Sequence, residues 1–336
     1  MPITIFPDRI EFNNYTLYIT NTGLRVNGNF GVRTLSPALA FQGSVRGYTG
    51  GGLVGGVASN IINKFSFVTS TANGSDIADL SVARYSTSGQ SSTTDGYTSS
   101  GRIFPTYSNV IDKFPFASDA NATDVGDTTN SVEGPAGHSD KWNGFGFMSA
   151  GQTGPNSNSS SVDRFPFASN ANATSVSSVT ARRRVTGQSS FDYGYTTGGY
   201  RPSPSLTFTL IERFSLASTT PIATQGDLTQ ARMNSSGQSS LVSGYTTTGG
   251  TPAPASFNTI DKFPFATLAN ATDVGDATKV NQSSAGHSST THGYESGGGG
   301  ASPINIIDRF PFASNANATD VGDLSTSISG PAGQQF

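Results

Sequence analysis

Hydrophobic and polar residues follow a short repeated pattern along most of the chain. A hexapeptide recurs six times, with an apolar residue, an acid or Asn, a base, Phe, Ser or Pro, and Phe or Leu. Its first Phe stands at positions 65, 114, 165, 214, 263 and 310, so successive copies are 47 to 51 residues apart. No segment keeps a helical period, and Gly and Pro recur about every 8–12 residues, which is typical of an all-β fold.

Each unit of the repeat divides into four predicted strands. In the fourth unit these are residues 187–190, 194–199, 211–216 and 226–229, and the third of them is the most hydrophobic. A strand this rich in Phe is expected to be buried on both faces, between neighbouring sheets. Units of about 50 residues with four strands each are typical of a β-propeller blade. The sequence therefore predicts an all-β, six-bladed propeller.

The two ends of the repeat region complement each other. Each complete unit has a Gly seven residues before its Gly-Tyr or Gly-Phe pair, but the unit with Gly47-Tyr48 lacks one within the repeat. Residues 333–336 (Gly-Gln-Gln-Phe) match the missing piece. We expect a strand at 331–336 to complete the blade formed by residues 44–80, because closure removes exposed sheet edges. The alternative is an open array with a truncated seventh repeat.

The order of these features resembles the kelch repeat. In that family a strand ending in Gly-Gly is followed by a variable loop, an aromatic strand and a fourth strand. Tyr195 with residues 198–199 and Tyr245 with residues 249–250 match the first part. The family's Trp in the fourth strand is missing, since the single Trp is Trp142. The resemblance implies a kelch-like propeller over the domain at residues 40–336.

Residues 1–39 do not repeat and form a separate predicted segment. Residues 3–6, 9–12 and 15–20 are expected to be strands, with turns at 21–23 and 27–28. A segment of this size is too small to hold a core alone. We expect it to be an attachment or oligomerisation arm, and a flap packed on its own propeller is the alternative.

This segment and the repeated Ile-Asp-Lys-Phe-Pro-Phe-Ala motif resemble structural proteins of tailed phages, particularly phages that infect cyanobacteria. The resemblance implies a virion component such as a tail fibre, a spike or a decoration protein. Its partners would be other virion proteins or copies of itself, bound through residues 1–39. Its location would be the virion, released by lysis, because the N-terminus lacks the basic and apolar regions of a secretory signal.

Composition excludes several classes of function. Charged residues make up 12% of the chain and the net charge is −3, so no nucleic-acid partner is expected. No stretch approaches the roughly 20 apolar residues of a membrane helix, so no membrane insertion is expected. The chain has no Cys and therefore no thiolate metal site. The one basic cluster, residues 182–184, is interpreted as a solvated turn, with a phosphate or anionic-glycan contact as the alternative.

Candidate catalytic groups are few. His138 and His287 stand where other repeats have Gln, which favours a hydrogen-bonding role over that of a base. The acidic loop at 119–127 superficially resembles a calcium loop, but Asp and Asn that cap a turn explain it better. We expect no catalytic residue, no cofactor and no metal, and hence not an enzyme. The alternatives are a polysaccharide-acting propeller enzyme that uses Glu133 or Glu295, and a cellular kelch-type scaffold that binds proteins.

The most variable parts of the repeat are the loops before the aromatic strand, at 101–107, 200–204 and 251–254. Equivalent loops of a repeat protein lie on one face, and loops on a rigid scaffold often bind ligands. The candidate binding residues are Phe104, Tyr107, Tyr200 and Arg201, which we expect to contact a host cell-surface glycan or a protein. Idle loops, or contacts with sister subunits, are the alternative.

Overall fold

The computed structural model describes residues 42–69, 71–218, 223–252, 255–299 and 302–336, and the backbone of four strands within residues 3–27. The chain divides into two compact units, Met1–Ala40 and Phe41–Phe336. Each is built from β-strands in its described part. The described residues include no helix with the length and hydropathy needed to cross a membrane.

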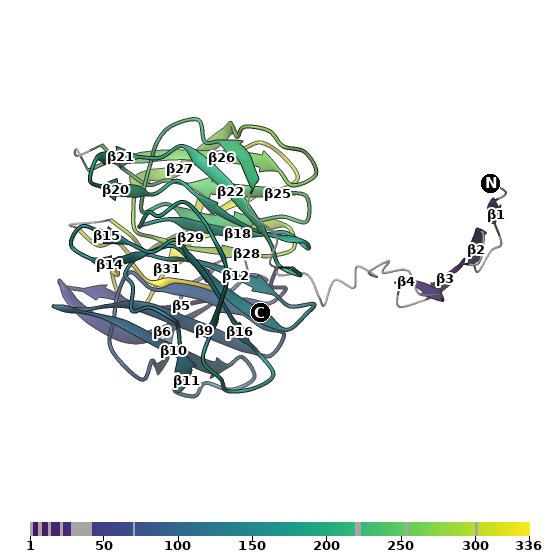
Figure 1. Ribbon diagram of the computed structural model, residues 1–336. Coiled ribbons are helices and arrows are strands. Elements are labelled where there is room, and N and C mark those ends of the chain that lie inside the picture. The colour runs from purple at the N-terminus through teal and green to yellow at the C-terminus, as the bar shows by residue number, and fades with distance from the viewer. Residues whose placement is uncertain are drawn as a thin grey trace. The chain divides into compact units, whose positions relative to one another are not determined.

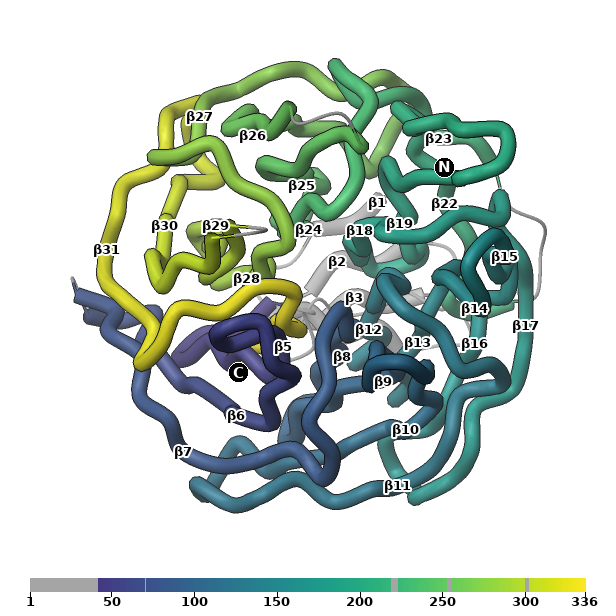
Figure 2. Tube along the Cα trace, turned by 90° about the vertical axis from the view of Figure 1, so that its left-hand side faces the viewer, coloured from purple at the N-terminus to yellow at the C-terminus, as the bar shows by residue number. Residues whose placement is uncertain are grey.

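The larger unit is a six-bladed β-propeller, in which six four-stranded antiparallel sheets surround one axis (Figure 2). From the axis outward, blade A contains β32 (Ala332–Gln335), β5 (Arg46–Val54), β6 (Val57–Ser66) and β7 (Ser75–Asp79). Blade B contains β8 (Ser88–Ser91), β9 (Asp95–Ile103), β10 (Thr106–Pro115) and β11 (Thr123–Asp127). Blade C contains β12 (Ala136–Asp140), β13 (Phe145–Ser149), β16 (Ser161–Pro166) and β17 (Thr174–Ser178).

The remaining blades follow the same order. Blade D contains β18 (Thr186–Ser189), β19 (Tyr193–Thr197), β22 (Leu210–Ser215) and β23 (Ala223–Asp227). Blade E contains β24 (Ser236–Ser239), β25 (Ser243–Thr247), β26 (Phe257–Pro264) and β27 (Thr272–Asn281). Blade F contains β28 (Ala285–Ser288), β29 (His292–Ser296), β30 (Ile306–Pro311) and β31 (Thr319–Asp323). Two small hairpins, β14–β15 (Gln152–Gly154, Ser157–Asn158) and β20–β21 (Tyr200–Pro202, Ser205–Thr207), extend blades C and D.

The ring closes as the sequence predicts. β32 pairs antiparallel with β5, with Ala332 opposite Gly50 and Gln335 opposite Gly47. The C-terminal strand is thus the innermost strand of the blade that begins the propeller. This pairing rules out an open array with a truncated seventh repeat.

Aromatic residues fill the spaces between blades. Tyr97 of β9 stacks on Phe167 from the next blade, with ring centroids 4.8 Å apart, and lies 5.5 Å from Phe165. Its hydroxyl donates a hydrogen bond to the Phe167 carbonyl at 3.2 Å. On the other face of the strand that carries Phe165, Val162 packs in one cluster with Phe214 of blade D, so the third strand is buried on both faces, as predicted. The same stack recurs at Tyr48–Phe116, Tyr195–Phe265, Tyr245–Phe312 and Tyr294–Phe67.

Glycine at the axis lets the blades approach. A Cβ atom added to any glycine of the innermost strands would lie well under 3.0 Å from a glycine carbonyl oxygen of the neighbouring blade. No larger residue fits there without moving backbone. These contacts form a closed ring around the axis through Gly89, Gly137, Gly187, Gly237, Gly286 and Gly333.

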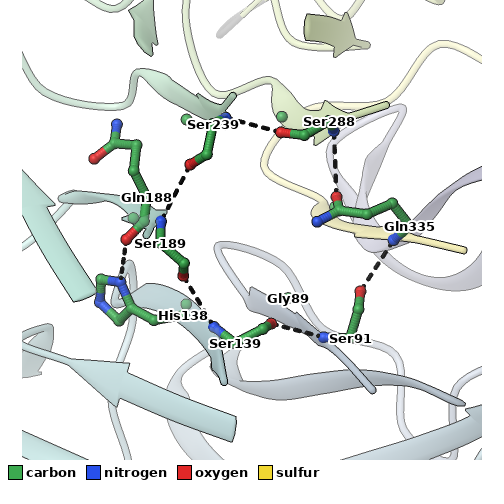
Figure 3. Close-up of a pocket in the computed structure, with 14 residues that line it drawn as sticks. Gly89, Ser91, His138, Ser139, Gln188, Ser189, Ser239, Ser288 and Gln335 are labelled. Atoms are coloured by element: carbon green, nitrogen blue, oxygen red, sulfur yellow. Dashed lines mark hydrogen bonds between the residues drawn. The ribbon is translucent and has the colours of Figure 1, made fainter. Parts of the chain in front are cut away.

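A second closed ring, formed by hydrogen bonds, lies two residues further along these strands (Figure 3). The Ser91 amide donates to the Ser139 hydroxyl at 2.9 Å, and Ser139, Ser189 and Ser239 repeat the contact with the next blade. In blade A, Gln335 takes the serine position: its amide donates to Ser91 Oγ at 3.0 Å, and its Oε1 accepts from the Ser288 amide. The rings hold the six blades in one register.

The N-terminal unit is a four-stranded antiparallel sheet in the order β1 (Ile3–Ile5), β2 (Arg9–Phe12), β3 (Tyr15–Thr20) and β4 (Gly23–Asn27). The first three strands lie where the sequence predicts them. The fourth was not predicted, because its two ends carry turn residues and its short apolar pattern gave no clear period. The predicted turns at residues 21–22 and at residue 28 lie outside the described residues.

Candidate binding surface

The loops between the second and third strands gather on one face of the propeller, as predicted. Figure 1 shows the hairpins β14–β15 and β20–β21 together on the left-hand side, away from the C-terminus. The connections between blades run beside them, with isolated bridges between Tyr85 and Arg102, Glu133 and Gln152, and Arg183 and Tyr200. We call this side the loop face.

Arg102 organises the part of the loop face that belongs to blade B. Its guanidinium lies 5.2 Å from the ring centroid of Phe104 and 5.4 Å from that of Tyr107. Its Nη1 donates to Glu133 Oε2 at 2.8 Å. Although burial opposes the charge, the bond to Glu133 raises the pKa of Arg102 above its ordinary value. Phe104 is 75% exposed, so one aromatic ring faces solvent beside a fixed cation.

A second cation–aromatic group comes from blade D and its connection to blade C. The guanidinium of Arg183 lies 5.3 Å from the Tyr200 ring centroid, and that of Arg201 lies 5.6 Å from the Phe208 ring centroid. The Tyr200 hydroxyl is hydrogen-bonded to Ser205 at 3.2 Å. Burial, with repulsion from nearby Arg184, lowers the pKa of Arg183.

Glu133 lies between the two groups, and Gln152 extends the first of them. Glu133 Oε1 lies 4.0 Å from Arg184 Nη2, while its other oxygen binds Arg102. Gln152 Nε2 donates to the Tyr107 hydroxyl at 3.1 Å. We call this surface the arginine–tyrosine cluster. It consists of Arg102, Phe104, Tyr107, Glu133, Gln152, Arg183, Arg184, Tyr200, Arg201 and Phe208.

The cluster is basic although the protein is slightly acidic. It contains four arginines and one glutamate, which gives the patch a formal charge of +3 on a chain of net charge −3. Cations fixed beside aromatic rings attract anionic groups and offer flat apolar faces next to them. The arrangement suits a ligand that has both.

The structure places the four sequence-predicted residues in this cluster. Phe104 and Tyr107 both contact Arg102, and Tyr200 and Arg201 lie on β20. The connecting roles of Arg102, Gln152 and Phe208 were not predicted from the sequence. Glu133 was named there only for the enzyme alternative, and residues 183–184 only within the basic cluster. Arg102 and Glu133 are 31 positions apart, so no local pattern reveals their contact. The sequence signal that could have identified these positions is that their residues differ from those at the equivalent positions of other repeats.

The interpretation of residues 182–184 as a solvated turn was wrong. Arg182 is fully buried and paired with Glu212, while Arg183 and Arg184 are partly buried on the loop face. A basic run is usually solvated, but here the first guanidinium is buried against the second and third strands of blade D. The run therefore divides into one core residue and two residues of the surface cluster.

The histidines take the structural positions expected of them. His138 and His287 are 1% and 0% exposed, and the Nδ1 of His138 lies 3.1 Å from the Gln188 carbonyl, the contact drawn in Figure 3. Burial lowers the pKa of each to about 4. They bind the neighbouring blade, as Gln90 and Gln188 do in their own repeats.

An Asn-Ala-Thr motif recurs at one repeat position, beginning at residues 121, 172, 270 and 317, and its Asn links neighbouring blades. Asn121 Oδ1 accepts a hydrogen bond from the Asp79 amide of the preceding blade at 3.0 Å. Asn172, Asn270 and Asn317 make the same link. In the acidic loop that superficially resembles a calcium site, Asp124 accepts from the Gly126 amide and Asp119 pairs with Lys64.

The axial channel is a poorer candidate for ligand binding. Its walls are mostly glycine, serine and backbone, and its cavities hold about 60 to 90 Å³. Gln42 crosses the mouth near the serine ring: its Nε2 donates to the Ser239 carbonyl, and its own carbonyl accepts from Lys141 Nζ. The loop face is therefore the better binding surface.

Comparison with known proteins gives no further assignment. No protein-family model matches the chain, and no curated protein matches its sequence.

Proposed function

We propose that this chain is a non-enzymatic component of a virus particle whose kelch-like propeller binds an acidic glycan on the host cell surface. The arginine–tyrosine cluster is the binding site in this proposal. Residues 1–39 attach the propeller to other virion proteins or to copies of itself.

The observation that carries the binding role is the loss of sixfold repetition on the loop face. The axial glycines and the Tyr–Phe stacks recur around the ring. The loops of blades B and D instead carry arginines and aromatic residues, whereas the loops of blades C, E and F consist largely of Thr, Pro, Ala, Ser, Asn and Gly. Repetition alone is enough to build the fold, so the fold does not require arginines and aromatic residues to be concentrated in particular loops. A binding site for a ligand does require this.

The chemistry of the cluster favours an acidic sugar. Guanidinium groups bind carboxylates and sulfates with paired hydrogen bonds, and aromatic rings offer flat faces to the apolar side of a sugar ring. The arginines already rest on aromatic rings and Glu133, so ligand binding costs little additional side-chain entropy. Glu133 is held by Arg102, which favours a positioning role for this acid over a catalytic one.

A glycan array with uronate-rich, sulfated and neutral polysaccharides tests the binding role. We expect the full chain to bind acidic glycans, and Arg183→Ala and Arg102→Ala each to weaken binding about tenfold, equal to about 1.4 kcal/mol. Arg309→Ala is the matched control, because it removes the same charge from β30 outside the cluster. Equal binding by all variants, or by neutral glycans, would refute the proposal, and shortened glycan products would favour the enzyme alternative.

The virion role rests on the resemblance of residues 1–39 and of the repeat motif to phage structural proteins. Mass spectrometry of purified particles tests it directly, and absence of the chain from particles would refute it. A shortened chain that begins at Phe41 tests the arm. We expect the full chain to assemble or decorate particles and the shortened chain to remain a monomer. If both are identical monomers, the arm is not an attachment device.

A further inference from the structure

Three blades contain a buried arginine between the preceding connection and the third strand. Arg84 Nη1 donates to Asp112 at 2.8 Å, and its Nη2 donates to the Thr98 carbonyl at 2.9 Å. Both side chains of this pair are 0% exposed. Each guanidinium thus occupies a hollow lined by a carboxylate and main-chain oxygens. Blades D and E repeat the arrangement with Arg182–Glu212 and Arg232–Asp261.

Blade F keeps the acid and replaces the arginine. Asp308 stands at the acid position and Asn281 at the arginine position, while Glu295 replaces the threonine that the other three blades have on the second strand. The Asn281 amide group donates to Glu295 Oε1 at 2.7 Å and to the Gly297 carbonyl at 2.9 Å. The blade therefore holds two carboxyl groups where the others hold one carboxylate and a guanidinium.

These two carboxyl groups are buried side by side. Glu295 and Asp308 are direct partners across β29 and β30, and they are 4% and 6% exposed. Both line a cavity of about 10 Å³, with Thr278, Asn281 and the exposed Lys279 also in its wall. The Oε2 atom of Glu295 has no hydrogen-bond partner among the described residues. A cavity of this volume holds about one water-sized group.

Blade A shows a different solution to the same loss. There Ile328 stands at the arginine position and Asn63 at the acid position, so both charges disappear together. Blade F has instead added an acid. Burial of that acid without a cation raises the pKa of Glu295 to about 7, and desolvation raises the pKa of Asp308 as well. The exposed Lys279 opposes this rise at Asp308 only in part. Two buried carboxyl groups without a buried cation cost stability.

We propose that the cavity between Glu295 and Asp308 binds one hard cation of the calcium class, in place of the guanidinium of blades B, D and E. The carboxylates of both residues would be its ligands. The main-chain oxygen of Glu295 would be a third, since the equivalent Thr246 oxygen accepts from Arg232. Calcium takes oxygen ligands in irregular geometry, which suits this set. All three ligands belong to blade F, so the ion would join the second and third strands of that blade.

Calorimetric titration of the chelator-treated full chain with CaCl₂ at pH 8 tests the site. We expect one calcium per chain and a higher melting temperature with calcium. Glu295→Gln and Asp308→Asn should each weaken binding at least tenfold. Asp119→Asn is the control and should keep binding unchanged, because Asp119 belongs to an exposed ion pair on another blade.

A charge-restoring variant separates the ion from folding effects. Asn281→Arg combined with Glu295→Thr rebuilds the arginine–aspartate pair of blade E, and we expect this chain to be stable without calcium and insensitive to it. The proposal is overturned if the original chain binds no calcium. It is overturned equally if its stability responds only to pH, because a proton alone would then occupy the site.

Discussion

The buried pair in blade E offers the sharpest test of how the propeller interior is stabilised. Arg232→Ile introduces the residue that stands at the equivalent position of blade A, Ile328. It leaves the 0%-exposed Asp261 with only its bonds to the Thr229 amide and hydroxyl, at 2.9 and 2.7 Å. A buried carboxylate that loses its cation costs about 3–5 kcal/mol. We expect a decrease of that size in the free energy of unfolding.

The double variant Arg232→Ile, Asp261→Asn should restore most of this loss. In blade A, Asn63 Oδ1 accepts from the Ser325 amide at 3.1 Å and hydroxyl at 2.5 Å, the same two bonds that Asp261 makes. We expect the double variant to lie within about 1–2 kcal/mol of the original chain, because neutral replacements of buried ion pairs are often tolerated. Urea unfolding followed by circular dichroism measures both. A double variant as unstable as the single one would refute the reasoning.

Three further outcomes follow from the structure. Gly187→Ala, which places a Cβ against backbone of the neighbouring blade, should cost at least about 1–3 kcal/mol, whereas Gly154→Ala, with its nearest atom at 3.8 Å, should be nearly neutral in thermal melting. His138 and His287 have folded pKa values of about 4, below the ordinary 6.5, so their contribution is full above pH 6.5 and is lost as the pH falls toward 4. The loss is about 3 kcal/mol each, and a chain with His138→Gln and His287→Gln should show a much flatter stability profile between these pH values. Deleting β32 exposes the edge of β5, and we expect aggregation in light scattering, where a chain that stays monomeric and folded would contradict ring closure as a source of stability.

The fold could be predicted because its determinants are local and repeated. The Gly-Tyr pair and the Phe hexapeptide each mark one strand, and their spacing alone gives the number of blades. Closure followed from register, since Gly333 continues the series of axial glycines. The hydrogen bonds of the serine ring were not predicted, because serine is common in this chain and its partners lie in different blades.

The cluster and the buried pairs could be predicted only in part, because both depend on contacts between distant positions. Arg182 pairs with Glu212, 30 positions away, and neither residue shows from its neighbours that it is buried. Arg84, Arg182 and Arg232 occupy one repeat position, which marks them as interior rather than surface residues. The local run at 182–184 obscured this periodicity.

The core and the binding surface are connected at Phe208. The guanidinium of Arg182 lies 5.6 Å from the centroid of the Phe208 ring, and the guanidinium of Arg201 lies at the same distance from that centroid. Phe208 therefore rests on a buried charge whose position is fixed by Glu212 and the Thr196 carbonyl. In a repeat protein each interface is stabilised mainly by its neighbours, so blade D can hold this loop rigid while blades E and F carry different loops. The part of the loop face around Phe208 thus depends on an interior ion pair of the same blade.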